Sequence, residues 1–242
     1  MKNPPWHRDE IILALELYFR LEPGQIHARN PKIIELSDIL NRLPIHETIP
    51  DQQTFRNPNG VSLKLSNFLA IDPNYQGKGM EAYSKLDYET FMEFVDDKER
   101  LISLADQIRR TVSNSDLNLR LFKIENQEED ETYRVKEGLV IYKLHKLRER
   151  NASINRKKKE KILRDKGKLE CEVCGFDFYH FYGEIGKAFI ECHHKKPLSE
   201  IESEVTTTIE DLALVCSNCH RMLHREISTL SMEELKKRIE KR

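Results

Sequence analysis

Apolar residues recur at helical spacing through the first part of the chain. Residues 9–21 (DEIILALELYFRL) place acids in their first turn, where the helix dipole favours negative charge. Asn30 followed by Pro31 is typical of a helix start, and residues 32–43 (KIIELSDILNRL) keep the apolar pattern up to Pro44. The pattern therefore predicts two successive helices in this stretch.

Further helices are predicted around two polar loops. The loops are TFRNPNGV (54–61) and DPNYQGKG (72–79), which are rich in Asn, Pro and Gly. Between them, the apolar stripe of an amphipathic helix is formed at i, i+4, i+7 and i+8 by Val61, Leu65, Phe68 and Leu69. Residues 88–112 have the pattern of one long helix. Residues 1–112 are therefore predicted to form an all-α domain.

The next segment changes character. Residues 113–137 are polar and acidic, and we interpret residues 113–140 as a connector. Two short pieces within the segment, LRLFKI (119–124) and TYRV (132–135), have a β-like composition. The remaining residues, 141–242, are expected to form a second domain.

The net charge of −1 conceals a strong asymmetry along the chain. Residues 143–168 carry twelve Lys and Arg against three acids, a net charge of +9, whereas residues 1–97 carry a net charge of −5. This basic segment is predicted to be a helix that starts at Asn151 and ends at Gly167. A basic helix is either a solvated surface or a contact for phosphate groups. Its place directly before a cysteine motif favours phosphate contact.

Composition narrows the class of protein. A hydrophobic content of 38% beside 33% charged residues favours small domains joined by charged helices. No apolar run approaches the roughly 18–20 residues of a membrane span, and the start MKNPPWHRDE lacks the apolar centre of a secretory signal. We expect a soluble cytoplasmic protein, in which cysteines act as metal ligands rather than in disulfides.

Four of the five cysteines form two C-x2-C pairs, Cys171/Cys174 and Cys216/Cys219. Four thiolates in this arrangement suit tetrahedral Zn²⁺. The alternative is four ordinary core residues, but the repeated spacing argues against it. Because a closed four-sulfur shell leaves no position for chemistry, this zinc is expected to be structural, stabilising a module too small to bury a sufficient core.

The histidines near these cysteines indicate a second site. His220 and His224 are spaced i, i+4, so on a helix both can reach one metal ion. His193 and His194 are adjacent in a predicted strand, where neighbouring side chains point to opposite faces. One of the two can bind the metal and the other is left to accept a proton, since imidazole titrates near neutral pH.

The segments CEVCGFDF, YGEIGKAFIECHHKKPLS and EDLALVCSNCHRMLH, in this order, resemble the HNH (ββα-metal) endonucleases of the methylcytosine-specific restriction enzyme A (McrA-like) group. The resemblance covers about residues 141–225. It implies that His193 binds a catalytic divalent metal, Mg²⁺, Mn²⁺ or similar, together with His220, His224 or both. It also implies that His194 is the general base that activates water, and that the products carry 5′-phosphate and 3′-hydroxyl ends.

The chain departs from that family at one position. Asp211 stands where the family usually has the middle Asn, and Asn218, within the second cysteine pair, is the other candidate for the supporting role. An Asp before a helix is commonly a cap, and an Asn in a knuckle commonly shapes the turn. Either residue can therefore have a purely structural role.

Polar and aromatic residues on the loops of the first domain are candidate DNA contacts. PWHRDE, TFRNPNGVSLKLSNF and DPNYQGKG resemble the sulfur-binding domain that recognises phosphorothioate-modified DNA, in which an apolar cavity receives the sulfur. Relatives of that domain have also been linked to methylcytosine. Taken from the loops and from this resemblance, the candidate contacts are His7, Arg8, Arg56, Asn57, Asn59, Tyr75, Lys78 and Gly79. Each of them also suits an ordinary turn.

The sequence thus predicts an α+β protein with an all-α recognition domain at 1–112 and a zinc-stabilised HNH domain at 141–242. The expected function is modification-dependent restriction of double-stranded DNA, with phosphorothioate the favoured modification. The alternatives are an HNH endonuclease for an unmodified sequence and an inactive zinc-stabilised DNA-binding protein. Double-strand cleavage by a one-site nuclease suggests a homodimer, through residues 88–112 or the C-terminal residues 231–242.

Overall fold

The computed structural model describes residues 3–46, 48–77, 82–122, 138–149, 151–195, 207–225 and 230–241. The chain divides into two compact units. Unit 1 comprises Met1–Glu128 and Arg134–Lys143, and unit 2 comprises Glu129–Tyr133 and Leu144–Arg242. Among the helices of the described residues, none combines the length and the apolar character needed to span a bilayer.

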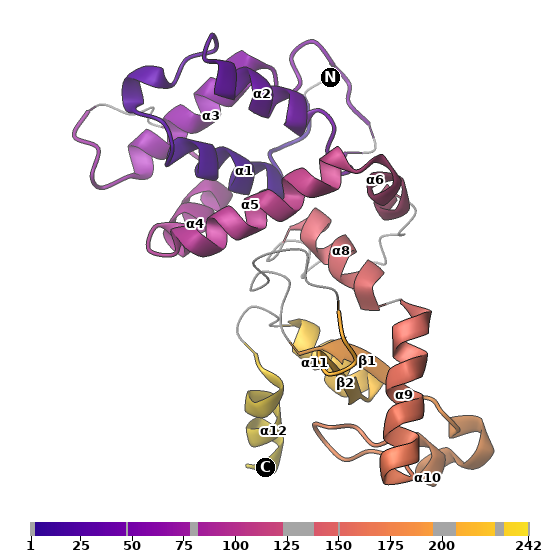
Figure 1. Ribbon diagram of the computed structural model, residues 1–242. Helices are drawn as coiled ribbons and strands as arrows, with labels where there is room; N and C mark the ends of the chain where they lie inside the picture. Colours follow the sequence, from indigo (N-terminus) through magenta and orange to yellow (C-terminus); the bar gives the residue numbers. More distant parts are fainter. Residues whose placement is uncertain are drawn as a thin grey trace. The chain divides into compact units, whose positions relative to one another are not determined.

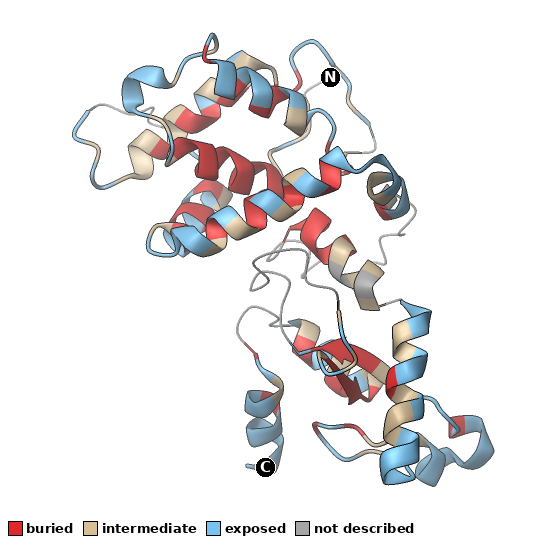
Figure 2. Ribbon diagram, in the orientation of Figure 1, coloured by how far each residue is buried: buried red, intermediate tan, exposed pale blue. Residues whose placement is uncertain are grey.

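The elements of regular secondary structure in the described residues of unit 1 are all helices (Figure 1). Its elements are α1 (Arg8–Tyr18), η1 (Pro23–Gln25), α2 (Pro31–Leu40), α3 (Pro58–Ile71), α4 (Lys85–Phe94), α5 (Lys98–Ser113) and α6 (Ser115–Phe122). Helix α1 is buried along its whole length because α2, α3, α4 and α5 pack around it (Figure 2). The predicted all-α character of this region is therefore confirmed for the described residues.

Side-chain caps explain where these helices begin. His7 accepts a hydrogen bond from the Asp9 N–H, and Glu10 accepts one from the His7 N–H, which makes a capping box at the start of α1. Asn30 caps α2 through the Lys32 N–H, as its sequence predicts. Asn57 caps α3 by accepting the Gly60 N–H at 2.8 Å, so this helix begins inside the predicted loop 54–61.

Two sequence predictions are wrong here. The single helix expected over 88–112 is two helices, because the chain breaks after Phe94 and Asp97 caps α5 by accepting the Arg100 N–H. The β-like piece at 119–124 is helical at residues 119–122, the end of α6. Asn114 accepts the Leu117 N–H and so caps the start of that helix. This local hydrogen bond favours the helix over the strand that the composition suggested. Residues 132–135, the other β-like piece, lie outside the described residues.

Unit 2 combines helices with a small sheet. Helix α8 (Leu139–Glu149) starts within the predicted connector, and its last residues belong to unit 2. The other elements are α9 (Ala152–Lys166), α10 (Phe178–Tyr182), η3 (Gly183–Gly186), β1 (Glu191–His194), β2 (Leu212–Val215), α11 (Ser217–Arg225) and α12 (Met232–Glu240). In the described residues β1 pairs antiparallel with β2. The predicted α+β class is confirmed.

The basic helix α9 has the predicted boundaries. Asn151 caps its start, and Gly167 ends it in the left-handed conformation with φ of 70°. Ile154 and Ile162 of this helix pack against the apolar cluster that contains Leu212 and Leu214 of β2. Helix α9 is therefore fixed on the sheet by its apolar side, and most of its basic residues are left at the surface.

Candidate functional site

The four predicted zinc ligands lie together in unit 2. The sulfur atoms of Cys171, Cys174, Cys216 and Cys219 all lie within 4.8 Å of one another. The Cys174 N–H donates to Cys171 Sγ at 3.5 Å and the Cys219 N–H donates to Cys216 Sγ at 3.4 Å. Cys174 Sγ and Cys216 Sγ are 3.7 Å apart, close to the roughly 3.8 Å between two ligands of a tetrahedral zinc with Zn–S bonds of about 2.3 Å. The geometry fits a structural zinc.

The local environment of the thiols also fits a metal. Burial raises the pKa of Cys174 to about 11 and raises the pKa of Cys219 further. At Cys171 burial also raises the pKa, but backbone N–H groups of the two knuckles outweigh it, so the pKa of this thiol is below its usual value. A zinc ion displaces the protons that Cys174 and Cys219 otherwise retain, because thiolates are the ligands.

A second group of four donors is formed by one carboxylate and three imidazoles. Glu149, the last residue of α8, places Oε1 3.2 Å from His193 Nδ1 and 3.0 Å from His220 Nε2. The same oxygen is 3.2 Å from His224 Nε2, and the two Nε2 atoms of His220 and His224 are 2.9 Å apart. Three separate elements, α8, β1 and α11, thus supply one compact donor set, named here the His–Glu cluster.

These distances match the spacing of ligands around one cation. With metal–nitrogen and metal–oxygen bonds of about 2.1 Å, neighbouring ligands stand about 3.0 Å apart in octahedral and about 3.4 Å apart in tetrahedral geometry. Three donor–donor distances in the His–Glu cluster, 3.0 to 3.2 Å, lie in this range, and the fourth, 2.9 Å between the Nε2 atoms of His220 and His224, lies just below the octahedral value. Imidazole nitrogen and carboxylate oxygen are also the donor types that divalent first-row metals accept.

Glu191 in β1 orients one imidazole of the cluster. Its Oε2 shares a hydrogen bond with His220 Nδ1, and its Oε1 accepts from Ser217 Oγ at 2.6 Å. Burial lowers the pKa of His220, but the hydrogen bonds with Glu149 and Glu191 outweigh it and raise that pKa to about 9. When Nδ1–H is held by Glu191, the lone pair of Nε2 faces the cluster, as in carboxylate–histidine–metal arrangements.

The adjacent histidines of β1 have different surroundings. His193 is 5% exposed and belongs to the His–Glu cluster, and burial lowers its pKa. His194 is 4% exposed, stands opposite Leu212 in the sheet and is not a member of that donor set. Adjacent strand residues point to opposite faces, which gives the two imidazoles separate environments.

Asp211 and Asn218 occupy different positions around the hairpin. Asp211 Oδ2 accepts from the Thr208 N–H at 2.8 Å and from Thr208 Oγ1 at 2.7 Å. The Asp211 carbonyl accepts the Lys195 N–H at 2.9 Å, which continues the pairing of β1 with β2. Asn218 lies exposed in the first turn of α11. The Asp211 side chain thus closes the turn before β2, and its backbone extends the pairing of the two strands.

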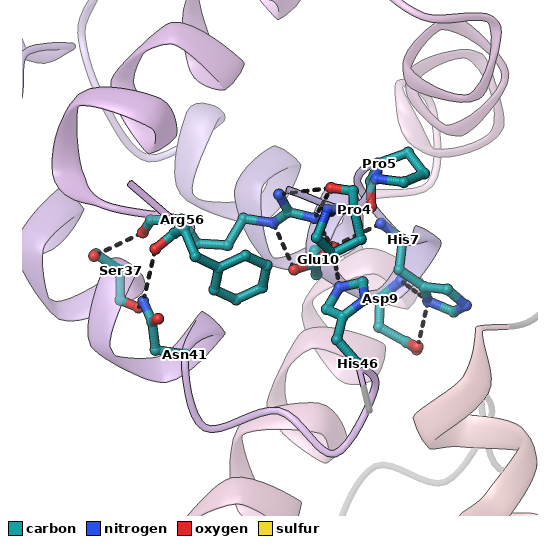
Figure 3. Close-up of polar contacts among 10 residues, drawn as sticks. Pro4, Pro5, His7, Asp9, Glu10, Ser37, Asn41, His46 and Arg56 are labelled. Atoms are coloured by element: carbon teal, nitrogen blue, oxygen red, sulfur yellow. Dashed lines mark hydrogen bonds and ion pairs between the residues drawn. The ribbon is translucent and has the colours of Figure 1, made fainter. Parts of the chain in front are cut away.

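In unit 1, the predicted DNA contact Arg56 is buried in an ion-pair network (Figure 3). Its Nε donates to Glu10 Oε1 at 2.7 Å and its Nη2 donates to Glu10 Oε2 at 2.8 Å. The same guanidinium donates to the carbonyls of Pro4 and Pro5 and lies 4.5 Å from the centre of the Trp6 ring. The φ of 42° at Arg56 is a strained value that this network holds in place.

Arg8 is similarly engaged, and His7 partly so. Arg8 is 5% exposed and donates to Glu93 Oε2 at 2.6 Å. His7 Nδ1 lies 3.0 Å from Asp9 Oδ2, and its side chain is 25% exposed. Burial lowers the pKa of His7, but the hydrogen bond with Asp9 outweighs it, so this pKa is raised. The structure thus gives both basic side chains acidic partners within unit 1.

The remaining candidate contacts of unit 1 are divided between caps and the surface. Asn57 serves as the cap of α3, Asn59 is exposed in the first turn of that helix, and Tyr75 is half-buried after it. Lys78 and Gly79 lie outside the described residues. The structure brings Asn57 and Asn59 together on one helix start but leaves their role in DNA binding a prediction.

Sequence reasoning missed two acids of unit 2. In the sequence, Glu149 is one of three acids within the basic run 143–168, and nothing in its local sequence marks it as a ligand. Glu191 stands two residues before His193, so its side chain shares a face of β1 with His193, and this period of two was a usable signal.

The HNH endonuclease family model matches residues 171–226. The match contains both cysteine pairs and the three histidines of the His–Glu cluster, whereas Glu149 precedes it. No curated protein and no solved structure matches the chain. The HNH domain implies metal binding, nuclease activity and DNA as the substrate.

Proposed function

We propose that this protein is a modification-dependent DNA endonuclease in which unit 2 hydrolyses phosphodiester bonds and unit 1 selects modified DNA. The main support is the donor set itself: three imidazole nitrogens, including that of His193, and one carboxylate oxygen lie close enough to share a metal ion. His194 is the next residue of the same strand, within the segment that matches the HNH family model. Metal binding and proton transfer need different side chains, and the two adjacent histidines supply them.

The proposed chemistry divides among named residues. His193, His220 and His224 would hold one divalent metal, which when bound would supply Lewis-acid stabilisation to the reacting phosphate and the departing 3′ oxygen. A ring nitrogen of His194 takes the proton of the attacking water. The products are a 5′-phosphate end and a 3′-hydroxyl end.

Supporting residues keep these groups in position. Glu191 fixes the ring of His220 through its Nδ1 atom. Asp211 braces the β1–β2 hairpin through Thr208, and we assign it the supporting role of the family's middle Asn; Asn218 is the other candidate. The four-cysteine cluster joins the segment before β1 to the start of α11, and so stabilises the strand and the helix that carry the histidines.

Helix α9 supports binding to the phosphate backbone. Arg156 and Arg164 have side chains 73% and 76% exposed, and Lys157 and Lys166 are also exposed. Phosphate contacts of this kind position a nuclease on DNA without reading its sequence. They make binding dependent on salt, because each neutralised phosphate releases counterions.

We assign selection of the modification to the loops of unit 1, with phosphorothioate favoured over methylcytosine. The residues proposed for contact with the modified strand are His7, Asn57, Asn59, Tyr75, Lys78 and Gly79. Sulfur is larger and more polarizable than oxygen and costs less to desolvate, so a half-buried aromatic such as Tyr75 is a suitable neighbour. Arg8 and Arg56 contribute through the fold that presents these loops.

Matched duplexes test the proposal. Unmodified, cytosine-methylated and singly phosphorothioated duplexes of one sequence are incubated with wild type at one fixed salt, with Mg²⁺ or Mn²⁺. We expect preferential cleavage of the phosphorothioate duplex, and loss of cleavage in His194→Ala with DNA binding retained. Equal cleavage of the three duplexes contradicts the modification claim. Full activity of His194→Ala contradicts the assignment of the base.

A second candidate is an HNH endonuclease that reads an unmodified sequence. It is favoured by the buried ion pairs of Arg8 and Arg56, because these pairs engage within the fold two side chains that were expected to contact DNA. Cleavage of a randomised unmodified duplex pool, followed by sequencing of the ends, distinguishes the two: a fixed sequence at the cut sites supports this candidate. Absence of cleavage under all metals supports an inactive DNA-binding protein.

A further inference from the structure

Glu149 lies 22 residues before the segment that matches the HNH family model, yet its side chain reaches the three histidines of that segment. We propose that Glu149 is a fourth protein ligand of the catalytic metal, recruited from helix α8 outside the HNH segment. The inference rests on the proposed function, because it concerns the metal centre of that nuclease.

Three contacts of the Glu149 side chain converge on one oxygen atom. Oε1 stands 3.2 Å from His193 Nδ1, 3.0 Å from His220 Nε2 and 3.2 Å from His224 Nε2. The side chain is only 8% exposed, so the carboxylate is held inside the cluster. A surface acid that merely balances the basic run has no need of this position.

Hydrogen bonding among the imidazoles explains these positions less well than a shared cation does. Glu191 engages His220 Nδ1, so once a metal ion displaces the proton of Nε2, the lone pair of that atom points into the cluster. His224 Nε2 lies 2.9 Å from that atom, so at most one proton fits between the two nitrogens. A cation that accepts both lone pairs and the Glu149 oxygen satisfies the donors together.

A carboxylate ligand changes the charge balance of the metal centre and therefore its affinity for a divalent ion. Three neutral imidazoles leave the full charge of a divalent ion uncompensated in a buried site, whereas Glu149 contributes one negative charge at the ion. Its removal should therefore weaken metal binding more than the loss of a group that only orients a ligand, which typically costs 10- to 100-fold in affinity.

The test measures metal affinity in the full-length protein with its four-cysteine site loaded with zinc. Mn²⁺ binding is followed by titration calorimetry and by the loss of the free-ion signal in electron paramagnetic resonance. We expect Glu149→Gln, which keeps the size and removes the charge, to weaken Mn²⁺ binding by more than about 100-fold. Glu149→Asp keeps the charge but moves the carboxylate oxygen away from the cluster. Its Mn²⁺ affinity should lie between those of Glu149→Gln and wild type.

Two further variants separate ligation from indirect effects. Glu191→Gln removes a group that only orients His220, and it should weaken Mn²⁺ binding by about 10- to 100-fold. Glu160→Gln removes an acid of α9 whose side chain is 65% exposed, and it should leave Mn²⁺ binding unchanged. Circular dichroism and zinc content confirm that each variant is folded.

The outcomes are distinguishable. If Glu149→Gln is folded and binds Mn²⁺ as tightly as wild type, the carboxylate is a structural acceptor for the histidines and the inference is overturned. If wild type binds Mn²⁺ through Glu149 but cleaves no DNA duplex, the ligand assignment stands and the proposed nuclease function fails.

Discussion

The four-cysteine cluster and the His–Glu cluster both bring four donors within 4.8 Å in unit 2, but they are assembled differently. The cysteines come from two C-x2-C pairs, whose spacing can be recognised directly in the sequence. The donors of the His–Glu cluster come from α8, β1 and α11, and Glu149 is 44 residues before His193. Both sites need the tertiary fold, since Cys174 and Cys216 are also 42 residues apart. The difference is that each cysteine pair is recognisable from its local spacing, whereas Glu149 has no neighbour in sequence that marks it as a ligand.

Removal of one thiol should have the largest effect, because zinc binding and folding are coupled. We expect Cys171→Ser to lose zinc and to unfold unit 2, since apparent zinc-binding free energies of about 10–16 kcal/mol exceed the stability of a small domain. Zinc content and hydrogen exchange measured along the chain check this.

Unit 1 is the internal control for that substitution. None of its described residues belongs to either donor cluster, so its amide protection should persist in Cys171→Ser. A variant that retains the exchange protection of unit 2 without zinc contradicts the structural role of the four cysteines.

Substitution of the adjacent histidines should separate metal binding from proton transfer. We expect His193→Ala and His194→Ala each to slow DNA cleavage by at least about 10²-fold, the lower range for loss of a positioned base. Only His193→Ala should also weaken Mn²⁺ binding, because His193 Nδ1 belongs to the His–Glu cluster. Single-turnover cleavage and Mn²⁺ titration are the two measurements. Equal Mn²⁺ affinity in both variants contradicts the division of roles.

The contrast between the two clusters also shows what the sequence could predict. The paired C-x2-C spacing and the i, i+4 histidines are local patterns, and both predicted groups come together in the structure. Helix starts at Asn30 and Asn151 were likewise predictable, because a cap needs only neighbouring residues. Glu149 was not, because a ligand from another helix has no local signature.

In unit 1 the prediction failed in the opposite way: a residue that the sequence suggested as a DNA contact is buried in the fold. Arg56 lies in a loop-like RNPNG segment, which suggested exposure and DNA contact, but its guanidinium pairs with Glu10 in the first turn of α1. A basic residue in a turn and a basic residue in a buried ion pair look alike in sequence. Only the partner, 46 positions away, distinguishes them.

The Arg56–Glu10 pair should respond to substitution without affecting either donor cluster. We expect Arg56→Ala to destabilise unit 1 by about 3–5 kcal/mol, because it leaves the buried carboxylate of Glu10 without its main partner. Zinc content and Mn²⁺ affinity should equal those of wild type. Urea denaturation followed by the fluorescence of Trp6, which stacks on Arg56, reports on unit 1. A change in Mn²⁺ affinity contradicts the independence of the two regions.

The Arg56–Glu10 pair also predicts that unit 1 loses stability at acidic pH. Burial raises the pKa of Glu10, but hydrogen bonds from His46 and Arg56 outweigh it and hold that pKa below its ordinary value of 4.5. A lowered pKa in the folded state means that the stabilisation is complete above pH 4.5 and is lost as the pH falls through the folded value. Denaturation midpoints between pH 7 and pH 3 should fall in wild type and depend less on pH in Glu10→Gln.

The smallest expected effect concerns the exposed bases of α9, which belong to neither cluster. The double substitution Arg156→Gln and Arg164→Gln should lower the salt dependence of DNA binding, with the slope of log affinity against log salt reduced by up to about 1.8, roughly 0.9 for each lost phosphate contact. Mn²⁺ and zinc binding should stay as in wild type, because both side chains point to solvent. An unchanged slope, measured by fluorescence anisotropy across a salt series, contradicts a phosphate contact by α9 and leaves these bases as a solvated surface.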